Sequence, residues 1–305
     1  MHILIIRPGA IGDTLLTFPV IEALKAHYQD PHVTLVSNPA VLPLAQAWHI
    51  ADEVANYGDT QWSELFSTAG ICSPIMHSVL QRITLAICWL RDPDGVVKRN
   101  LLAAGIQHEI VAPGRPPQGA RRHIVEYLAQ TVGIAIAVST PPRLPPLYAS
   151  NLNANPMFIA IHPGSGGASK CWPVSHFAAV IKALWARHVP VLLLAGPADT
   201  GRVTALLQQL PSPPQASLLN VVIDAPLLHV AELLQGCKGY LGNDSGITHL
   251  AALLNVPTLA LFGPSDPAVW RPLGASVRIL HEPVLENLQV DGVIRTIEEI
   301  WMRRV

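Results

Sequence analysis

The sequence predicts an α/β protein made of two domains, each built on a parallel sheet. Short apolar strands alternate with segments whose apolar residues recur at helical spacing, and this order is typical of parallel strands joined by helices. The 305 residues are enough for two domains of about 150 residues each. The two halves also open alike, because IIRPGAIGD and AIHPGSGGA each run from an apolar strand into a Pro-Gly turn and a loop of small residues.

The first domain is expected to cover residues 1–140. Its strands are expected at 2–6, 33–36, 53–55, 83–90 and 108–111, and its helices at about 15–28, 39–48, 62–69, 95–104 and 124–132. Pro19 falls inside the first of these helices and should kink it or mark its true first turn, because proline has no N–H for a helix interior. Four prolines between Thr140 and Leu147 predict an extended linker over residues 141–155.

The second domain is expected to cover residues 156–284. Its strands are expected at 157–161, 191–195, 218–223, 238–241, 258–262 and 277–280, with helices at about 174–187, 200–210, 227–234 and 247–254. Open parallel sheets of this kind bind ligands at the carboxyl ends of their strands. The remaining segment, residues 285–305, contains a helix with no strand partner, and we expect this helix to pack back toward the first domain.

Composition excludes several classes of function. Half of the residues (50%) are apolar and 13% are charged, which predicts a large buried core, and a net charge of −1 argues against a nucleic-acid partner. The local exception is residues 82–122, where seven Lys/Arg against three Asp/Glu are either solvated helix faces or a site for an anionic partner. Four scattered cysteines lack the spacing of a zinc site and are typical of a reduced, cytosolic protein. No apolar run is long enough for a signal peptide or a membrane span, so at most a peripheral membrane contact is expected.

The most informative stretch is residues 240–270. Gly242 to Gly246, GNDSG, is a tight loop that follows a strand and opens a helix, so it offers free N–H groups and the positive end of a helix dipole to an anion. Asp244 and His249 flank this loop and suit contacts to hydroxyl or phosphate groups. The stretch is therefore interpreted as the seat for the diphosphate and sugar of a nucleotide-sugar, although Asp244 and Ser245 are also good helix caps and a lone histidine is usually structural.

A second candidate loop follows the first strand of the second half. Small residues, including Ser165 and Gly166, let backbone N–H groups approach a phosphate closely, and Lys170 supplies a positive charge nearby. The alternative is that Lys170 is an ordinary exposed lysine in a loop.

The loop at the start of the chain lacks the pattern of a dinucleotide site. Gly9 and Gly12 lack the three-glycine spacing, and the second strand ends without an acid for a ribose, so nicotinamide and flavin cofactors are not expected. Asp13 is the stronger feature, because a carboxylate at the end of this strand could accept the proton of an attacking hydroxyl. The alternative is that Asp13 only caps the first helix, although Leu16 provides no capping-box partner.

Taken together, the chain resembles the family of ADP-heptose:lipopolysaccharide heptosyltransferases. The segments that carry the resemblance are IIRPGAIGDTLLTFPVIEAL, HPGSGGASKCWP and GNDSGITHLAALLNVPTLALFGPSDP, in family order along the whole chain. The resemblance implies a GT-B fold, in which two Rossmann-like domains face each other across a cleft, with the acceptor bound by the first and the nucleotide-sugar by the second. It implies Asp13 as the general base and Lys170 as the phosphate lysine, and it places the donor motif on the residues Asp244, Ser245, Gly246 and His249.

The function expected from the sequence is therefore inverting glycosyl transfer, of a heptose from ADP-heptose to a hydroxyl of a glycan or glycolipid such as the lipopolysaccharide core. The resemblance implies no cofactor and no metal. The basic excess at residues 82–122 predicts an anionic acceptor, and the cysteines and the lack of long apolar runs predict a cytoplasmic protein at most peripheral to the inner membrane face. Two alternatives remain at this stage. A nucleotide-sugar epimerase or hydrolase of the same fold would consume donor without acceptor, and a non-catalytic nucleotide-sugar binding protein would not turn it over.

Overall fold

The computed structural model describes residues 1–138 and 158–302. The chain divides into two compact domains, Met1–Thr140 and Pro141–Val305. The proline-rich linker expected at residues 141–155 lies outside the described residues. Among the described residues, no helix combines the length and the apolar character needed to cross a membrane.

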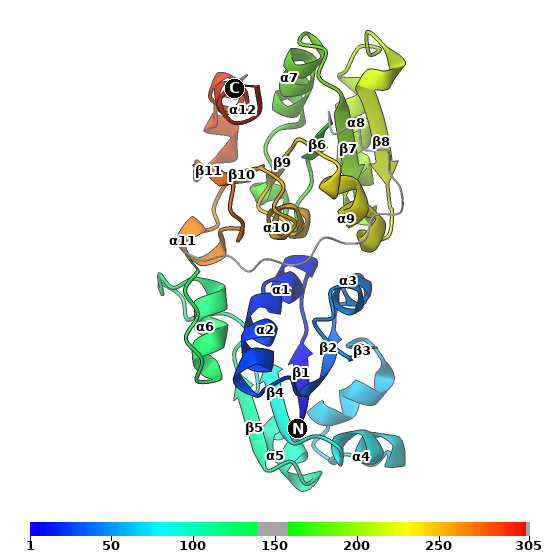
Figure 1. Ribbon diagram of the computed structural model, residues 1–305, viewed down its shortest axis with the longest axis vertical. Coiled ribbons are helices and arrows are strands. Elements are labelled where there is room, and N and C mark those ends of the chain that lie inside the picture. Colours follow the sequence, from blue (N-terminus) through cyan, green and yellow to red (C-terminus); the bar gives the residue numbers. More distant parts are fainter. Residues whose placement is uncertain (139–157, 303–305) are drawn as a thin grey trace. The chain divides into compact units, whose positions relative to one another are not determined.

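The first domain contains a five-stranded parallel sheet with strand order β3-β2-β1-β4-β5 (Figure 1). The strands are β1 (His2–Arg7), β2 (His32–Ser37), β3 (Glu53–Asn56), β4 (Leu85–Trp89) and β5 (His108–Ala112). The helices are α1 (Ile11–Leu15), α2 (Phe18–His27), α3 (Leu42–Ala47), α4 (Pro74–Leu80), α5 (Val96–Ala103) and α6 (Ile124–Thr131), with a 3₁₀ helix η1 (Thr60–Phe66). Strands β2 and β3 add to one side of β1, and β4 and β5 add to its other side. The point of reversal between β1 and β4 is where such sheets bind ligands.

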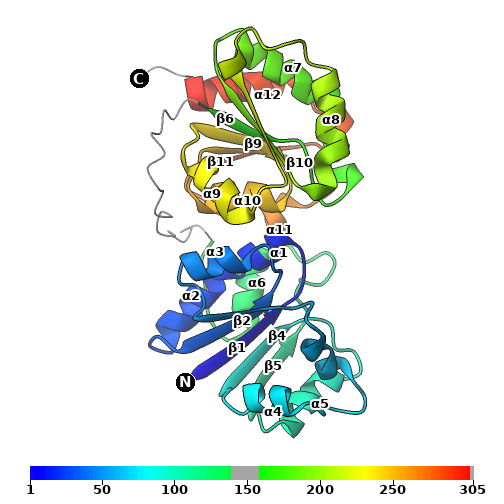
Figure 2. The same ribbon diagram turned by 90° about the vertical axis from the view of Figure 1, so that its right-hand side faces the viewer.

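Helices cover both faces of this sheet. Helices α2 and α6 pack together on one face, whereas η1, α4 and α5 bury the other (Figure 2). The single helix expected through Pro19 is two helices, with Pro19 in the first turn of α2, so the second of the two readings of this proline is confirmed. Helix α4 was not expected from the apolar pattern, although Ser73 and Pro74 are a typical helix start and the Ser73 hydroxyl accepts from Met76 N.

The second domain contains a six-stranded parallel sheet with strand order β11-β10-β9-β6-β7-β8. The strands are β6 (Ile159–His162), β7 (Val191–Ala195), β8 (Leu219–Ile223), β9 (Gly239–Asn243), β10 (Thr258–Phe262) and β11 (Val277–His281). The helices are α7 (Val174–Trp185), α8 (Thr200–Gln208), α9 (Leu227–Gln235), α10 (Gly246–Leu253), α11 (Pro267–Trp270) and α12 (Val290–Ile297), and α12 continues into a π-helical turn at Glu298–Met302. The strand order reverses between β6 and β9, so this sheet also has a single switch point. The prediction of two parallel-sheet α/β domains is confirmed.

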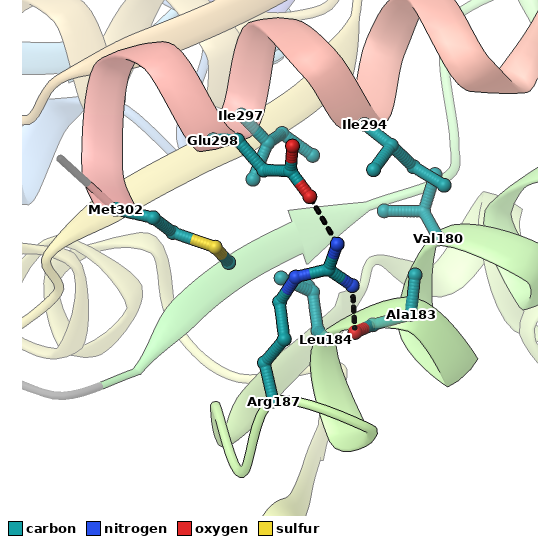
Figure 3. Close-up of a pocket in the computed structure, with 8 residues that line it drawn as sticks. All are labelled: Val180, Ala183, Leu184, Arg187, Ile294, Ile297, Glu298 and Met302. Atoms are coloured by element: carbon teal, nitrogen blue, oxygen red, sulfur yellow. Dashed lines mark hydrogen bonds and ion pairs between the residues drawn. The ribbon is translucent and has the colours of Figure 1, made fainter.

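The C-terminal helix, which we expected to pack back toward the first domain, packs within the second domain. Helices α7 and α12 pack together in the second domain, where Val293, Ile297 and Trp301 are buried in its core. Figure 3 shows residues of this contact between α7 and α12, which includes an ion pair between Arg187 and Glu298. The physical reason lies partly at Gly239, because a β-carbon there would lie 2.4 Å from the Trp301 ring. The sheet has room for the indole only because this position is glycine.

Candidate functional site

The first candidate site lies at the switch point of the first sheet. The loop after β1 leads directly into α1, and Asp13 is the third residue of that helix rather than its N-cap, so the reading of Asp13 as the N-cap is corrected. Its Oδ2 nevertheless accepts a hydrogen bond from Ala10 N over 3.1 Å, which ties the carboxylate to the start of the helix. The side chain is buried, with 8% of its surface exposed. Capping and a catalytic role are therefore not mutually exclusive for this residue.

Arg7 holds the other side of the Asp13 carboxylate. Its Nη2 donates to Asp13 Oδ1 over 3.1 Å, and its Nε donates to the Asp13 backbone carbonyl over 3.3 Å. The guanidinium is 3% exposed, and burial lowers the pKa of Arg7 while Asp13 opposes that shift. A β-carbon at Gly114 would lie 1.8 Å from Arg7 Nη1 and 2.7 Å from the Trp89 backbone oxygen. Only glycine therefore fits at this position of the loop after β5. Arg7 is thus a fixed cation, built into the fold beside the carboxylate.

A cavity of about 680 Å³ opens beside this ion pair, within the first domain. Its lining residues include Arg7, Arg91 and Arg115 and no Asp or Glu, and the structure describes all of them. Arg115 also lies 3.4 Å from Asp13 Oδ2 and is 69% exposed. A concave site with several guanidinium groups favours an anionic ligand.

The second candidate site lies at the switch point of the other sheet, after β6 and β9. Asn243, the last residue of β9, is fully buried and joins the two loops. Its amide nitrogen donates to Pro163 O over 2.8 Å and to Gly164 O over 3.2 Å, and its oxygen accepts from Trp172 N over 3.0 Å. The loop that carries Lys170 is therefore held against the end of β9 by one side chain.

The residues predicted for donor binding converge here. Lys170 Nζ donates to Asp244 Oδ2 over 2.7 Å, and His249 Nε2 lies 3.8 Å from Asp244 Oδ1. The Ser165 hydroxyl donates to the Asp244 carbonyl over 2.6 Å, whereas Gly166 lies exposed on the same loop. A lysine, a histidine and a carboxylate in one cluster can together bind phosphate and hydroxyl groups.

The helix that follows this cluster starts as the sequence predicted. Ser245 is the N-cap of α10, and its hydroxyl accepts from Thr248 N over 3.4 Å, so the capping reading of Ser245 is confirmed. Asp244 lies before the cap, and its carboxylate is directed to Lys170 and His249 instead. Gly246 is the first helical residue, and the N–H groups of a first helical turn have no intrahelical partners. The helix start therefore offers donors to an anion next to Lys170.

A buried pair beside this site was missed by the sequence reasoning. His162, the last residue of β6, shares a hydrogen bond of 2.9 Å between its Nε2 and Asp199 Oδ2, and its Nδ1 lies 3.4 Å from the Ser245 hydroxyl. Burial favours a higher pKa for Asp199, but the hydrogen bond and charge of His162 hold that pKa below its usual value. The available signal was positional, because His162 ends one strand and Asp199 follows the neighbouring one.

A set of potential metal ligands lies at the end of the first sheet opposite to Asp13. Within the described residues, His2, His32 and Glu53 bring ligand atoms within 4.8 Å of one another. These residues stand at the amino ends of β1, β2 and β3, and Asp13 follows the carboxyl end of β1.

Comparison with known proteins identifies the family. The model of glycosyltransferase family 9 (heptosyltransferase) matches residues 126–290. Lipopolysaccharide heptosyltransferase 2 of Escherichia coli K12 is 33% identical over an alignment 342 positions long, which covers 100% of this chain and 96% of the relative.

Two solved structures share the fold. The E. coli ADP-heptose LPS heptosyltransferase II superposes with a TM-score of 0.79 at 22% identity and covers 99% of each chain. The E. coli heptosyltransferase WaaC with ADP-2-deoxy-2-fluoro heptose superposes with a TM-score of 0.70 at 20% identity, covering 98% of this chain and 99% of that one. The chain therefore belongs to glycosyltransferase family 9, the heptosyltransferases, and is a glycosyltransferase of the GT-B fold.

Proposed function

We propose that the protein transfers a heptose from ADP-heptose to a hydroxyl of an anionic acceptor in the lipopolysaccharide core, with inversion at the anomeric carbon. The observation that carries the proposal is the Lys170–Asp244–His249 cluster at the start of α10, since it combines groups for a diphosphate with groups for a sugar. The name of the relative that is 33% identical, lipopolysaccharide heptosyltransferase 2, supports the choice of donor and acceptor.

The donor is assigned to the second domain. Lys170 and the N–H groups of the loops at Ser165, Gly166, Ser245 and Gly246 bind the diphosphate, and Asp244 and His249 orient the sugar. As the bond to the sugar breaks, negative charge grows on the leaving diphosphate, and these fixed donors stabilise it. Stabilisation of developing charge is usually the largest contribution of an enzyme to rate.

The acceptor is assigned to the cavity of the first domain. Its arginines favour phosphate or carboxylate groups on the glycan, in agreement with the basic excess at residues 82–122. Asp13 acts as the general base. Its carboxylate takes the proton of the acceptor hydroxyl as that oxygen attacks the anomeric carbon, and the nucleoside diphosphate leaves with the electron pair of the broken bond.

The test is incubation of the protein with ADP-heptose, with and without a lipopolysaccharide core acceptor. We expect ADP release that depends on acceptor, a product heavier by one heptose in mass spectrometry, and an inverted anomeric configuration by NMR. UDP- and GDP-sugars in parallel test the choice of nucleotide. Rapid loss of donor without acceptor would favour an epimerase or hydrolase, and tight donor binding without any turnover would favour a binding protein.

A further inference from the structure

Two arginines contact the same carboxylate in different ways. Arg7 binds Asp13 Oδ1, is 3% exposed, and is enclosed by the loop at Gly114. Arg115 lies 3.4 Å from Oδ2, comes from the loop after β5, and is 69% exposed. One cation is therefore fixed by the fold, and the other stands over the carboxylate from the solvent side.

The position of Arg115 conflicts with a base that is ready to act. A general base must reach the proton of the attacking hydroxyl at hydrogen-bond distance. Oδ1 of Asp13 is occupied by Arg7, and Oδ2 accepts from Ala10 N and faces the guanidinium of Arg115. With Arg115 in place, the remaining capacity of Oδ2 is directed to a cation rather than to a substrate hydroxyl.

We propose that Arg115 is a specificity-determining residue that covers Asp13 until an anionic group of the acceptor draws its guanidinium away. This inference rests on the proposed function, in which Asp13 is the base. Arg115 and Arg91 line the same cavity, so an anion bound there competes directly with Asp13 for Arg115. Water screens this ion pair at its exposed Arg115 end, whereas a phosphate or carboxylate can bind a guanidinium through two hydrogen bonds. The exchange frees Oδ2 at the moment when the correct acceptor arrives.

The same contact protects the donor from water. In the wasteful reaction, a water oxygen bonds to the anomeric carbon, its proton passes to Asp13, and the nucleoside diphosphate leaves with the electron pair of the broken bond. Arg115 over Oδ2 hinders that proton transfer when no acceptor is bound. Arg7 has the opposite effect, because it positions the carboxylate for either reaction.

The experiment measures two activities of Arg115→Ala: release of ADP from ADP-heptose without acceptor, and kcat/KM for a matched pair of acceptors. One acceptor is the core glycan with its phosphate and carboxylate groups, and the other has the phosphates removed and the carboxylates converted to amides. We expect acceptor-independent ADP release to rise roughly tenfold. This rise is smaller than the rate enhancement of roughly 10² to 10⁴ that a positioned base contributes, because Arg115 hinders the base only in part. The preference for the anionic acceptor should fall by at least the same factor, and Arg115→Lys should restore part of it.

Two further variants make the result specific. Arg7→Ala should lower transfer and ADP release together, so the two arginines should act with opposite sign on hydrolysis. Arg278→Ala, which removes an exposed arginine of β11 with no assigned role, should change neither activity. If Arg115→Ala lowers both activities in proportion and keeps the acceptor preference, Arg115 does not cover the base and the inference is overturned. If the wild type still transfers heptose, such a result for Arg115→Ala overturns only the inference on Arg115. If the wild type does not turn over ADP-heptose at all, the inference and the proposed function are both overturned.

Discussion

Lys170 Nζ lies 2.7 Å from Asp244 Oδ2, although 74 residues separate the two in sequence. The pair joins the loop after β6 to the loop after β9, which are the two loops at the switch point of the second sheet. The Asp244 carboxylate is buried, whereas the Lys170 side chain is 39% exposed. The ammonium group of Lys170 can therefore contact a bound ligand and still pair with Asp244. This geometry suits a cation shared between a protein carboxylate and a bound diphosphate.

The first prediction concerns Lys170. Lys170→Ala should weaken ADP binding by about 10- to 100-fold, because one charge-assisted contact in a partly enclosed site is worth roughly 1.5 to 3 kcal/mol. Calorimetric titration with ADP measures the effect, and Lys182→Ala, which removes an exposed lysine of α7, is the matched control. Equal ADP affinities for Lys170→Ala and the wild type would remove Lys170 from the donor site.

The second prediction concerns Asn243. Asn243→Ala should lower the free energy of unfolding of the second domain by about 1 to 3 kcal/mol, because it leaves buried backbone groups of Pro163, Gly164 and Trp172 without this partner. ADP affinity should fall as well, since the loop that carries Lys170 is no longer fixed. Denaturant unfolding and ADP titration measure the two effects. Asn220→Ala, at an exposed position in β8, is the control. If Asn243→Ala changes neither the free energy of unfolding nor the ADP affinity, Asn243 does not hold the loop.

The third prediction concerns the reactivity of the cysteines with pH. Burial raises the pKa of the Cys88 thiol to about 12 and that of Cys237 to about 12, and burial also raises the pKa of Cys171. The thiolate is the reactive form, so at pH 8 these thiols stay protonated and unreactive in the folded protein. Cys72 is exposed and should be alkylated first. Mass spectrometry after a short iodoacetamide treatment identifies the site, and rapid labelling of Cys88 in folded protein would contradict the prediction.

Much of the arrangement could be predicted from the sequence because it depends on strand order. Alternating strands and helices imply parallel sheets, and parallel sheets place the loops after neighbouring strands at one edge. The loops that carry Lys170 and Asp244 were therefore expected to meet, and the structure brings these two side chains together with His249. The role of each residue in catalysis stays a prediction.

The parts that could not be predicted depend on contacts between distant side chains. Nothing local distinguishes Asn243 from any polar residue at a strand end, because its three partners come from another loop. The ion pair between Arg7 and Asp13 was missed for a related reason, since the room for the guanidinium comes from Gly114. The C-terminal helix had no strand partner in the sequence pattern, and its place on the second domain depends on the space above Gly239.

The central claim is that Asp13 is the base of a glycosyl transfer, and the rate of heptose transfer from ADP-heptose by Asp13→Asn tests it most directly. Turnover should fall by roughly 10² to 10⁴, the usual contribution of a positioned base. Both carboxylate oxygens accept hydrogen bonds, from Arg7 and from Ala10 N, so the asparagine amide must face one donor and a small loss of stability is expected as well. ADP affinity, measured on the same sample, should equal that of the wild type, because the donor is assigned to the second domain. A fall of this size with unchanged ADP affinity is the predicted result, and turnover near that of the wild type would contradict the claim.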